Sequence, residues 1–242
     1  MTVPDADLAV YHAPTPNGWK ITICLEEMGL PYRLIPVRLG EDKSKAFLTA
    51  SPNAKIPALF DADGPEGKPI TLFESAAILI YLAEKTGRLL DPAPAGRYVA
   101  IQWLAWQVAG LGPMAGQNGH FLLYAAERIP YAIARFGTEV RRLYAVLDAQ
   151  LARTGAFVAG DAYSIADIAV FTWFRYFQRA NAYDGGTKFL DTPSYLNVAR
   201  WIDEIDAREP VKRGLRVNLT GEGMVRERHS AADIDAVLAT QA

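Results

Sequence analysis

The segment Pro14–Gly18 joins an apolar stretch to an amphipathic one and carries polar side chains at the junction. The stretch before it, Leu8–Ala13, is typical of a β-strand, and the apolar residues after it recur with the spacing of a helix that Gly29 can end. A helix N-terminus presents free backbone N–H groups and a partial positive charge, which suit a thiolate or another small anion. Thr15 and Asn17 add side-chain donors there. The junction therefore predicts either an anion-binding corner or an ordinary turn made of Pro, Asn and Gly.

Two further polar segments stand at the starts of predicted elements. Asn53–Pro57 precedes a strand, Ala58–Phe60, which a turn connects to Ile70–Phe73 as a hairpin. Glu74 and Ser75 follow that hairpin directly and open a helix, with Ser75 as its N-cap. A helix N-terminus with a hydroxyl can bind a carboxylate, and a neighbouring glutamate can accept from an ammonium group. The alternative is a plain helix cap with an acidic residue in its first turn.

The composition excludes several classes of function. The 242 residues carry a formal net charge of −2 without a dense Lys/Arg cluster, so we expect no nucleic-acid partner. Cys24 is the single cysteine, which excludes an internal disulfide, and the three histidines lack metal-binding spacing, so we expect no metal. The first residues lack the features of a signal peptide, and no uncharged apolar run reaches the roughly 18 residues of a membrane span. We expect a reduced, cytoplasmic protein that contacts no membrane.

The order of the elements predicts two domains. Residues 7–90 read as strand–helix–strand followed by strand–strand–helix, which is typical of a small mixed sheet with helices on its faces. A Pro-rich linker at 91–96 leads to an all-helical domain over 97–218. A tail at 219–242 is more polar and either frays or forms a short helix, Ser230–Leu238, that docks on the body or on a neighbouring subunit.

The helical domain has its own local signals. Tyr98–Gly110 is predicted to form a helix that Leu111-Gly-Pro113 ends, and a long helix is predicted from about Tyr131 to Thr154. Ser164-Ile-Ala-Asp167 is a capping box with Asp in place of Glu, before a helix that is apolar on all sides. A last helix is predicted at about Ser194–Ala207.

This combination resembles the cytosolic glutathione transferases over residues 7–215. Three elements carry the resemblance, because together and in this order they are specific: Asn53–Pro57 before a strand, Glu74-Ser75 before a helix, and the hydrophobic staple at Tyr163–Ile168 around the capping box. Ala13–Gly18 and Gly110–Phe121 resemble the bacterial nu class, which is related to the fungal nitrogen regulator and is closer to thiol–disulfide reductases than to conjugating enzymes. The resemblance implies a thioredoxin-like α/β domain with an all-α C-terminal domain, glutathione as bound co-substrate, and a homodimer.

The resemblance also implies roles for individual residues. Ser75 would bind the γ-glutamyl carboxylate of glutathione and Glu74 its ammonium group. Ile56 would pair through its backbone with the cysteinyl part, held by a cis bond to Pro57. Thr15 and Asn17 would stabilise the thiolate, since neither can act as a base at pH 7.

Other contacts are expected at the ends of the ligand. Arg135 matches a family position that contacts a glutathione carboxylate, with a solvated helix charge as the alternative. Gln107 is a further candidate, and Asn118 and His120 are weaker ones. Lys43, Asn53 and Lys55 are candidates for the glycine carboxylate, although the loop at 40–45 lacks the glutamine of the class.

Two residues compete with this assignment, and three functions remain open. Tyr11 lies inside the first strand, before the turn, and Cys24 lies on the apolar face of the first helix, where a buried thiol is expected. The hypotheses are a glutathione-dependent disulfide-bond oxidoreductase, with or without reduction of organic peroxides; a transferase or lyase acting on aromatic ethers, thioethers or other carbon electrophiles; and a non-catalytic glutathione-binding regulator.

Overall fold

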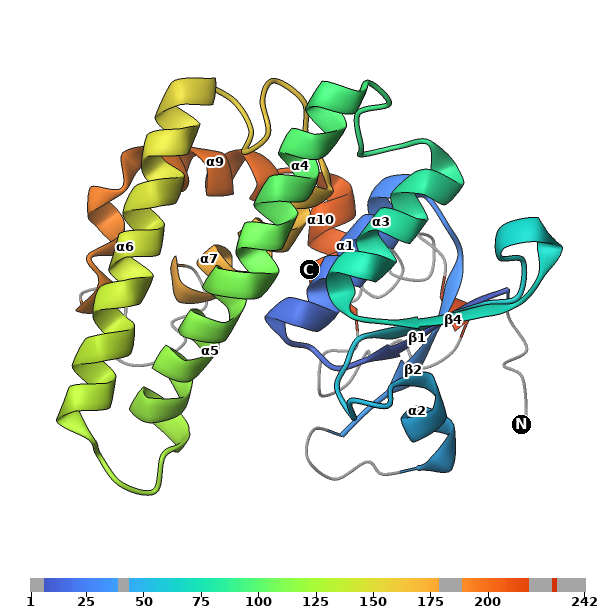
Figure 1. The fold of residues 1–242 in the computed structure, drawn as a ribbon, viewed down its shortest axis with the longest axis horizontal. Helices are drawn as coiled ribbons and strands as arrows, with labels where there is room; N and C mark the ends of the chain where they lie inside the picture. The colour runs from blue at the N-terminus through green and yellow to red at the C-terminus, as the bar shows by residue number, and fades with distance from the viewer. Residues whose placement is uncertain (1–6, 39–43, 179–188, 218–227, 230–242) are drawn as a thin grey trace, which may run out of the picture. The chain divides into compact units, whose positions relative to one another are not determined.

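The computed structural model describes residues 7–38, 44–178, 189–217 and 228–229 (Figure 1). Their contacts divide them into two compact units. One unit holds the residues up to Arg88 together with those from Arg208 onward, and the other holds Leu89–Ala207.

The first unit is built on a mixed β-sheet. The described strands lie in the order β4-β3-β1-β2-β5, with bounds β1 Leu8–His12, β2 Tyr32–Pro36, β3 Ala58–Asp61, β4 Ile70–Phe73 and β5 Arg228–His229. β1 and β2 run parallel with Val10 opposite Leu34, whereas β3 runs antiparallel to both β1 and β4. A parallel pair needs a crossover, and helix α1 (Pro16–Met28) provides it.

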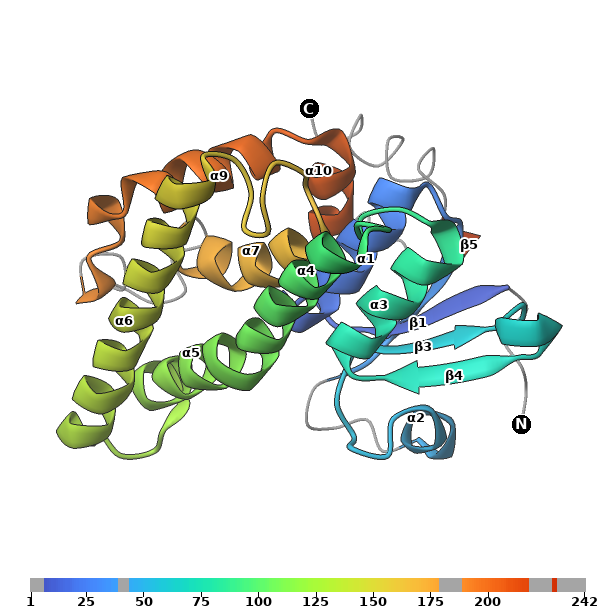
Figure 2. The same ribbon diagram turned by 45° about the horizontal axis from the view of Figure 1, so that its top comes forward.

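Helices cover both faces of this sheet. α1 and α3 (Ser75–Thr86) lie on one face and α2 (Lys45–Ala50) lies on the other (Figure 2). Between the sheet and the first pair lie fully buried apolar side chains such as Ile21, Leu25 and Leu79, whose removal from water is the main stabilising contribution. The α/β order predicted for this part of the chain is therefore confirmed.

Helix α10 (Glu209–Arg216) completes the first unit from the far end of the chain. It packs on α1, and the carbonyl of Gly214 accepts a hydrogen bond from Thr22 Oγ1 at 2.8 Å. A Cβ on Gly214 would lie 2.6 Å from the Cα of Ile23, so only glycine allows this approach. The sequence predicted one apolar face for α1, but nearly all of the helix is buried because α10 covers its polar side.

That polar side carries two buried glutamates. Glu27 accepts two hydrogen bonds from Arg208, at 2.6 and 2.8 Å, and Glu26 accepts one from Arg213 at 3.0 Å. Buried carboxylates need such partners, because an unpaired charge away from water is strongly unfavourable.

The second unit is helical. Its described helices are α4 Pro94–Trp106, α5 Gly112–Gly119, α6 Pro130–Thr154, α7 Ile165–Gln178 and α9 Leu196–Asp206, with a 3-10 turn at Thr192–Ser194. The long helix predicted at 131–154 is confirmed, and the predicted helix at 194–207 is found as α9. The boundaries 7–90, 91–96 and 97–218 remain a prediction, with α4 beginning at Pro94 and α10 grouped with the first unit.

The expected end of a helix at Leu111-Gly-Pro113 is wrong. The chain continues from α4 through π-helical turns at Gln107–Leu111 and, after α5, at His120–Tyr124. Proline cannot donate the hydrogen bond that a helix interior requires. The wider π turn accommodates Pro113, since the N–H of Gly112 bonds to the carbonyl of Gln107, five residues back.

The capping box is confirmed around Asp167. Its Oδ2 accepts from the backbone N–H and the hydroxyl of Ser164, both at 3.0 Å. Its Oδ1 accepts from the N–H of Val158 at 2.8 Å and from Nε1 of Trp201 at 3.0 Å. The carboxylate thus joins the start of α7 to a preceding loop and to α9.

The described residues bear on the predictions about membrane spans, metal sites and the tail. None of the helices there is both long and apolar enough to span a membrane. The same residues bring together no group of three or more His, Cys, Asp or Glu side chains that could hold a metal ion. Within the tail, Arg228–His229 pair with β2, while the helix predicted at 230–238 lies outside the described residues.

Candidate functional site

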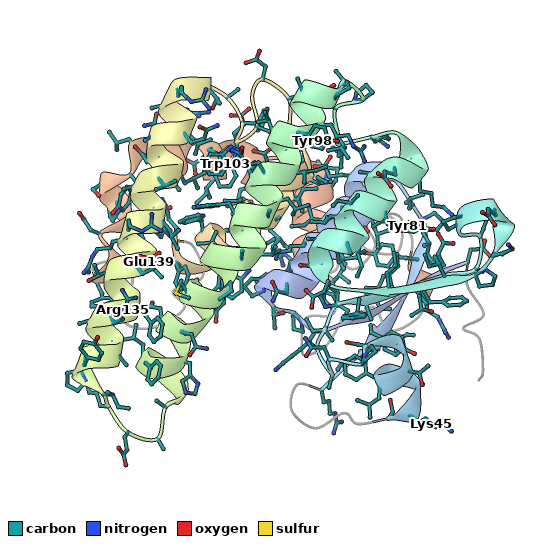
Figure 3. All side chains as sticks on the ribbon, in the orientation of Figure 1. Lys45, Tyr81, Tyr98, Trp103, Arg135 and Glu139 are labelled. Atoms are coloured by element: carbon teal, nitrogen blue, oxygen red, sulfur yellow. The ribbon has the colours of Figure 1, made fainter. Side chains whose placement is uncertain are left out.

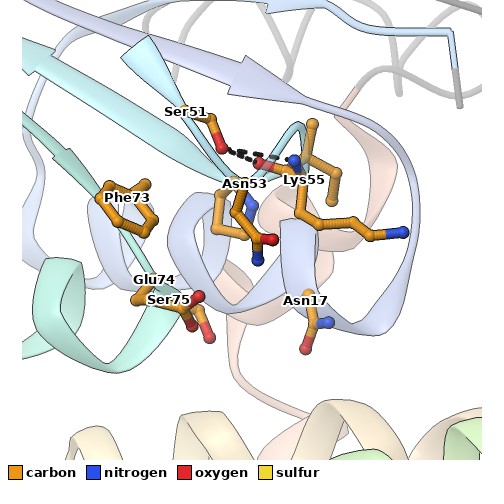
Figure 4. Close-up of a pocket in the computed structure, with 9 residues that line it drawn as sticks. Asn17, Ser51, Asn53, Lys55, Phe73, Glu74 and Ser75 are labelled. Carbon is orange, nitrogen blue, oxygen red and sulfur yellow. Dashed lines mark hydrogen bonds between the residues drawn. The ribbon is translucent and has the colours of Figure 1, made fainter. Parts of the chain in front are cut away.

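A pocket of about 210 Å³ opens in the first unit where α1 and α3 begin. Three segments line it, namely the start of α1, the loop after α2 and the junction of β4 with α3 (Figure 4). The lining residues are Asn17, Ser51, Asn53, Lys55, Ile56, Pro57, Phe73, Glu74 and Ser75. Seven residues predicted from the sequence for the site are among them, namely Asn17, Asn53, Lys55, Ile56, Pro57, Glu74 and Ser75.

The start of α1 is shaped by Thr15 and Gly18. Thr15 is the N-cap, and its Oγ1 accepts from the N–H of Gly18 at 3.4 Å, which leaves its O–H able to donate elsewhere. A Cβ on Gly18 would lie 2.1 Å from the carbonyl oxygen of Ala13, so glycine is required for the first turn to approach β1. Asn17, between them, is partly exposed and lines the pocket. Thr15 is adjacent in sequence but is not one of the lining residues.

The loop after α2 is held by a buried serine that sequence reasoning missed. Ser51 Oγ donates to the carbonyl of Lys55 at 2.7 Å and accepts from its N–H at 3.3 Å (Figure 4). Ala54 between them has a φ of 53°, in the left-handed region. The Ile56–Pro57 bond is cis, as the resemblance implied. The exposed side chains of Asn53 and Lys55 stand at the edge of the pocket.

The junction of β4 with α3 corrects one expectation. Ser75 was expected to be the N-cap, but the cap is Glu74 and Ser75 is the first helical residue. Glu74 makes no side-chain capping bond and has a φ of 72°, which is unfavourable for a residue with a Cβ and is typical of functional sites. Both residues line the pocket, with Glu74 exposed and Ser75 only 6% exposed.

Behind Ser75 lies a buried lysine. Lys20, on α1, is 1% exposed, and its Nζ donates to Ser75 Oγ at 3.1 Å. Burial lowers the pKa of Lys20 to about 7, while the charge of Glu74 acts in the opposite direction. Lys20 is four residues before Cys24, on the same helical stripe, and a lysine at a core position was the signal that could have identified it.

The two competitors for the thiol site are placed differently. Cys24 is 0% exposed, with its Sγ 3.8 Å from the sulfur of Met28, and burial raises the pKa of its thiol. A buried, protonated thiol is a poor nucleophile, which agrees with the structural role predicted for it. Tyr11 lies in β1, where its ring packs on Phe47 with centroids 5.6 Å apart.

The remaining predicted residues belong to the helical unit or lie outside the described chain. Arg135 is exposed on α6, one turn before Glu139 (Figure 3), and makes no hydrogen bond or ion pair with the described residues. Gln107 and Asn118 are fully buried, and His120 is exposed beside Phe121. Lys43 lies outside the described residues.

Comparison with known proteins identifies the family. The glutathione S-transferase N-terminal domain matches residues 15–85, and the C-terminal domain matches residues 130–204. A curated relative, the disulfide-bond oxidoreductase YfcG of Escherichia coli (strain K12), is 47% identical over 85% of this chain and 93% of its own length.

Solved structures of glutathione transferases are also similar to this chain. A glutathione transferase family member from Pseudomonas fluorescens, with two glutathione bound, is 42% identical with a TM-score of 0.81, covering 86% of this chain and 92% of the other. A glutathione transferase from Pseudomonas putida, with one glutathione disulfide bound per subunit, is 40% identical with a TM-score of 0.83, covering 91% and 95%. The chain with the Asn17, Ile56–Pro57 and Glu74–Ser75 pocket belongs to the glutathione S-transferase family.

Proposed function

We propose that this protein is a glutathione-dependent disulfide-bond oxidoreductase of the nu class. The observation that carries the proposal is the pocket, which brings an anion-binding helix start, a cis-proline loop and the Glu74–Ser75 junction together around one space. Relatives named for this activity, and structures holding two glutathiones or one glutathione disulfide, support it.

The pocket matches the three polar parts of glutathione. The start of α3 at Ser75 suits the γ-glutamyl carboxylate, and the exposed Glu74 suits the ammonium group beside it. The backbone of Ile56 can pair with the cysteinyl residue, as an added strand would. Asn53 and Lys55 stand at the pocket edge, where they can meet the glycine carboxylate.

Thr15 and Asn17 are the proposed catalytic residues. A thiol with a pKa near 8.5 is mostly protonated at neutral pH, and donors at a helix N-terminus favour its thiolate. The Thr15 hydroxyl and the Asn17 amide donate to that sulfur, and the thiol proton leaves to solvent. No protein base is needed.

The reaction then proceeds between glutathione and its substrate. The glutathione thiolate attacks one sulfur of a small disulfide, forming a mixed disulfide and releasing the other half as a thiolate that takes up a proton. A second glutathione thiolate attacks the glutathione sulfur of that mixed disulfide, releasing the second substrate thiol and glutathione disulfide. Arg135 is proposed to bind a carboxylate of glutathione, and we further propose a homodimer that works in the cytoplasm.

The test is reduction of a small model disulfide by glutathione. Thr15→Ala and Asn17→Ala together should lower kcat/KM by about 100-fold or more, because each removes a donor to the developing thiolate. Thr15→Ser, which keeps both the cap and the hydroxyl, and Cys24→Ser should each retain activity near the wild-type value. Full activity in the double variant, or its loss in Cys24→Ser with the fold intact by circular dichroism, would overturn the assignment.

A further inference from the structure

Lys20 carries a buried amino group that lies directly behind Ser75, one of the residues that line the pocket. Its Nζ lies 3.1 Å from Ser75 Oγ, and Ser75 is the first residue of α3. The proposed reaction gives Lys20 no role. A lysine in the core is costly unless its charge is used, because the ammonium group loses its hydration.

The hydrogen bond restricts the direction of the Ser75 hydroxyl. A serine hydroxyl has one proton to donate and lone pairs with which to accept. Since an ammonium group can only donate, Ser75 accepts in its contact with Lys20. The O–H of Ser75 therefore points away from Lys20 and is available to donate to a ligand in the pocket that Ser75 lines.

Glu74 is the acidic residue whose charge acts on Lys20, and it is exposed at the pocket. Other charged or titratable groups of α1 and of the elements packed on it have partners of their own. Among them are Glu26 with Arg213 and Tyr32, Glu27 with Arg208, Glu209 with Lys212, Lys85 and Tyr81 with Asp61, and Arg88 with the carbonyl of Met28. His12, at the end of β1, is neutral because burial lowers its pKa to about 3, and buried Cys24 remains a thiol.

We propose that Lys20 is a positioning residue for the carboxylate end of glutathione. It orients the Ser75 hydroxyl as a donor and places a positive charge beneath the bound γ-glutamyl carboxylate. This inference rests on the proposed glutathione site and deepens it, because it makes recognition of the ligand depend on one buried proton.

The proton linkage has a definite sign. A bound carboxylate favours the charged form of Lys20 and therefore raises its pKa from about 7. Between the pKa of the free protein and the higher pKa of the complex, binding takes up a proton. Affinity is therefore greatest below about pH 7 and falls by up to tenfold for each pH unit above it, until the pKa of the complex is reached.

The experiment is calorimetric binding of S-methylglutathione, which has no thiol to titrate. Titrations between about pH 6 and 8, in buffers with different ionisation enthalpies, give the affinity and the protons taken up. The wild type should bind about tenfold more weakly at pH 8 than at pH 6.5 and take up a fraction of a proton at pH 7.5. Lys20→Met, which keeps an unbranched side chain but lacks the terminal ammonium group, should weaken binding about tenfold at pH 6.5 and abolish both the pH dependence and the uptake.

Controls separate positioning from packing. Cys24→Ala, one turn further along α1, should keep the wild-type pH profile, and Ser75→Ala should reduce the proton uptake. In steady-state assays Lys20→Met should raise KM for glutathione far more than it lowers kcat at saturation.

The experiment distinguishes a failure of the role proposed for Lys20 from a failure of the proposed function. Wild-type binding without proton uptake, or an unchanged pH profile in Lys20→Met, would overturn the role of Lys20 and leave the proposed function standing. A wild type that binds no S-methylglutathione and reduces no disulfide would overturn the proposed function itself. If Lys20→Met does not fold, the wild-type and Ser75→Ala titrations still decide the question.

Discussion

Replacing Asp167 should produce a loss of stability whose size depends on pH. The side chain is 0% exposed and accepts four hydrogen bonds. Asp167→Ala leaves the backbone N–H groups of Val158 and Ser164 and Nε1 of Trp201 without this acceptor. Each buried donor left unsatisfied costs about 1–3 kcal/mol, so we expect a loss of about 5 kcal/mol at pH 5.

The pH dependence follows from the raised pKa of the carboxyl group. Burial raises the pKa of Asp167 from 3.8 to about 6, although its hydrogen bonds act in the opposite direction. The folded state therefore binds more protons than the unfolded state between about pH 4 and 6, and wild-type stability falls as the pH rises through that range. The loss caused by Asp167→Ala should accordingly be about 1.4 kcal/mol smaller at pH 7.5 than at pH 5.

Urea unfolding, followed by far-ultraviolet circular dichroism at matched protein concentration, measures the loss of unfolding free energy at pH 5 and at pH 7.5. Asp167→Asn keeps one acceptor oxygen, so it should lose about 3 kcal/mol at pH 5 with the same change between the two pH values. Asp161→Ala removes a nearby exposed carboxylate and should change stability by less than about 0.5 kcal/mol. A loss below about 1 kcal/mol in Asp167→Ala would refute the argument from the hydrogen-bond network. If Asp167→Ala lost the same unfolding free energy at pH 5 and pH 7.5, the argument that burial raises the pKa of Asp167 would be refuted.

Three further predictions concern the pocket and its supports. Glu74→Gly removes the Cβ from a backbone with a φ of 72°, so it should raise the unfolding free energy by about 1 kcal/mol, measured by urea titration, while weakening glutathione binding. Arg135→Ala should leave the melting temperature unchanged and raise KM for glutathione several-fold, and an unchanged KM would assign Arg135 to a solvated helix face. Gly214→Ala places a Cβ 2.6 Å from the Cα of Ile23 and should cost about 2–3 kcal/mol in the same unfolding assay, whereas a stable variant would show that α10 can move away from α1.

Local signals in the sequence predicted most of the first unit. Alternating and helical periodicities located the strands and helices to within a few residues, because those patterns reflect burial on one face. Sequence reasoning predicted three parts of the site because each is defined by neighbours in sequence: the turn at Asn17, the Ile56–Pro57 bond and the Glu74–Ser75 junction. Their meeting in one pocket came from the family resemblance and is present in the structure.

Features that depend on distant residues were missed. The sequence pattern indicates no role for Lys20, because that role depends on Ser75, which is 55 residues away in the chain and lies beside it only in the fold. The helix through Pro113 was predicted to end, since nothing local shows that a π turn will accommodate a proline. Ser51 carries no pattern of its own, and its importance comes from the loop that it closes.

The return of α10 to α1 has a consequence for how the protein is made. The ribosome completes strands β1–β4 and α1 well before residues 208–217 emerge, because the whole helical unit is synthesised in between. During that interval Arg213 and Arg208 are not yet available to Glu26 and Glu27, and α10 does not yet cover α1 beside Ile23. The first unit therefore reaches its final packing only after the whole helical unit has been synthesised. For the same reason, a fragment ending at Arg88 would not be an independent domain, although its sheet is complete apart from the two-residue β5.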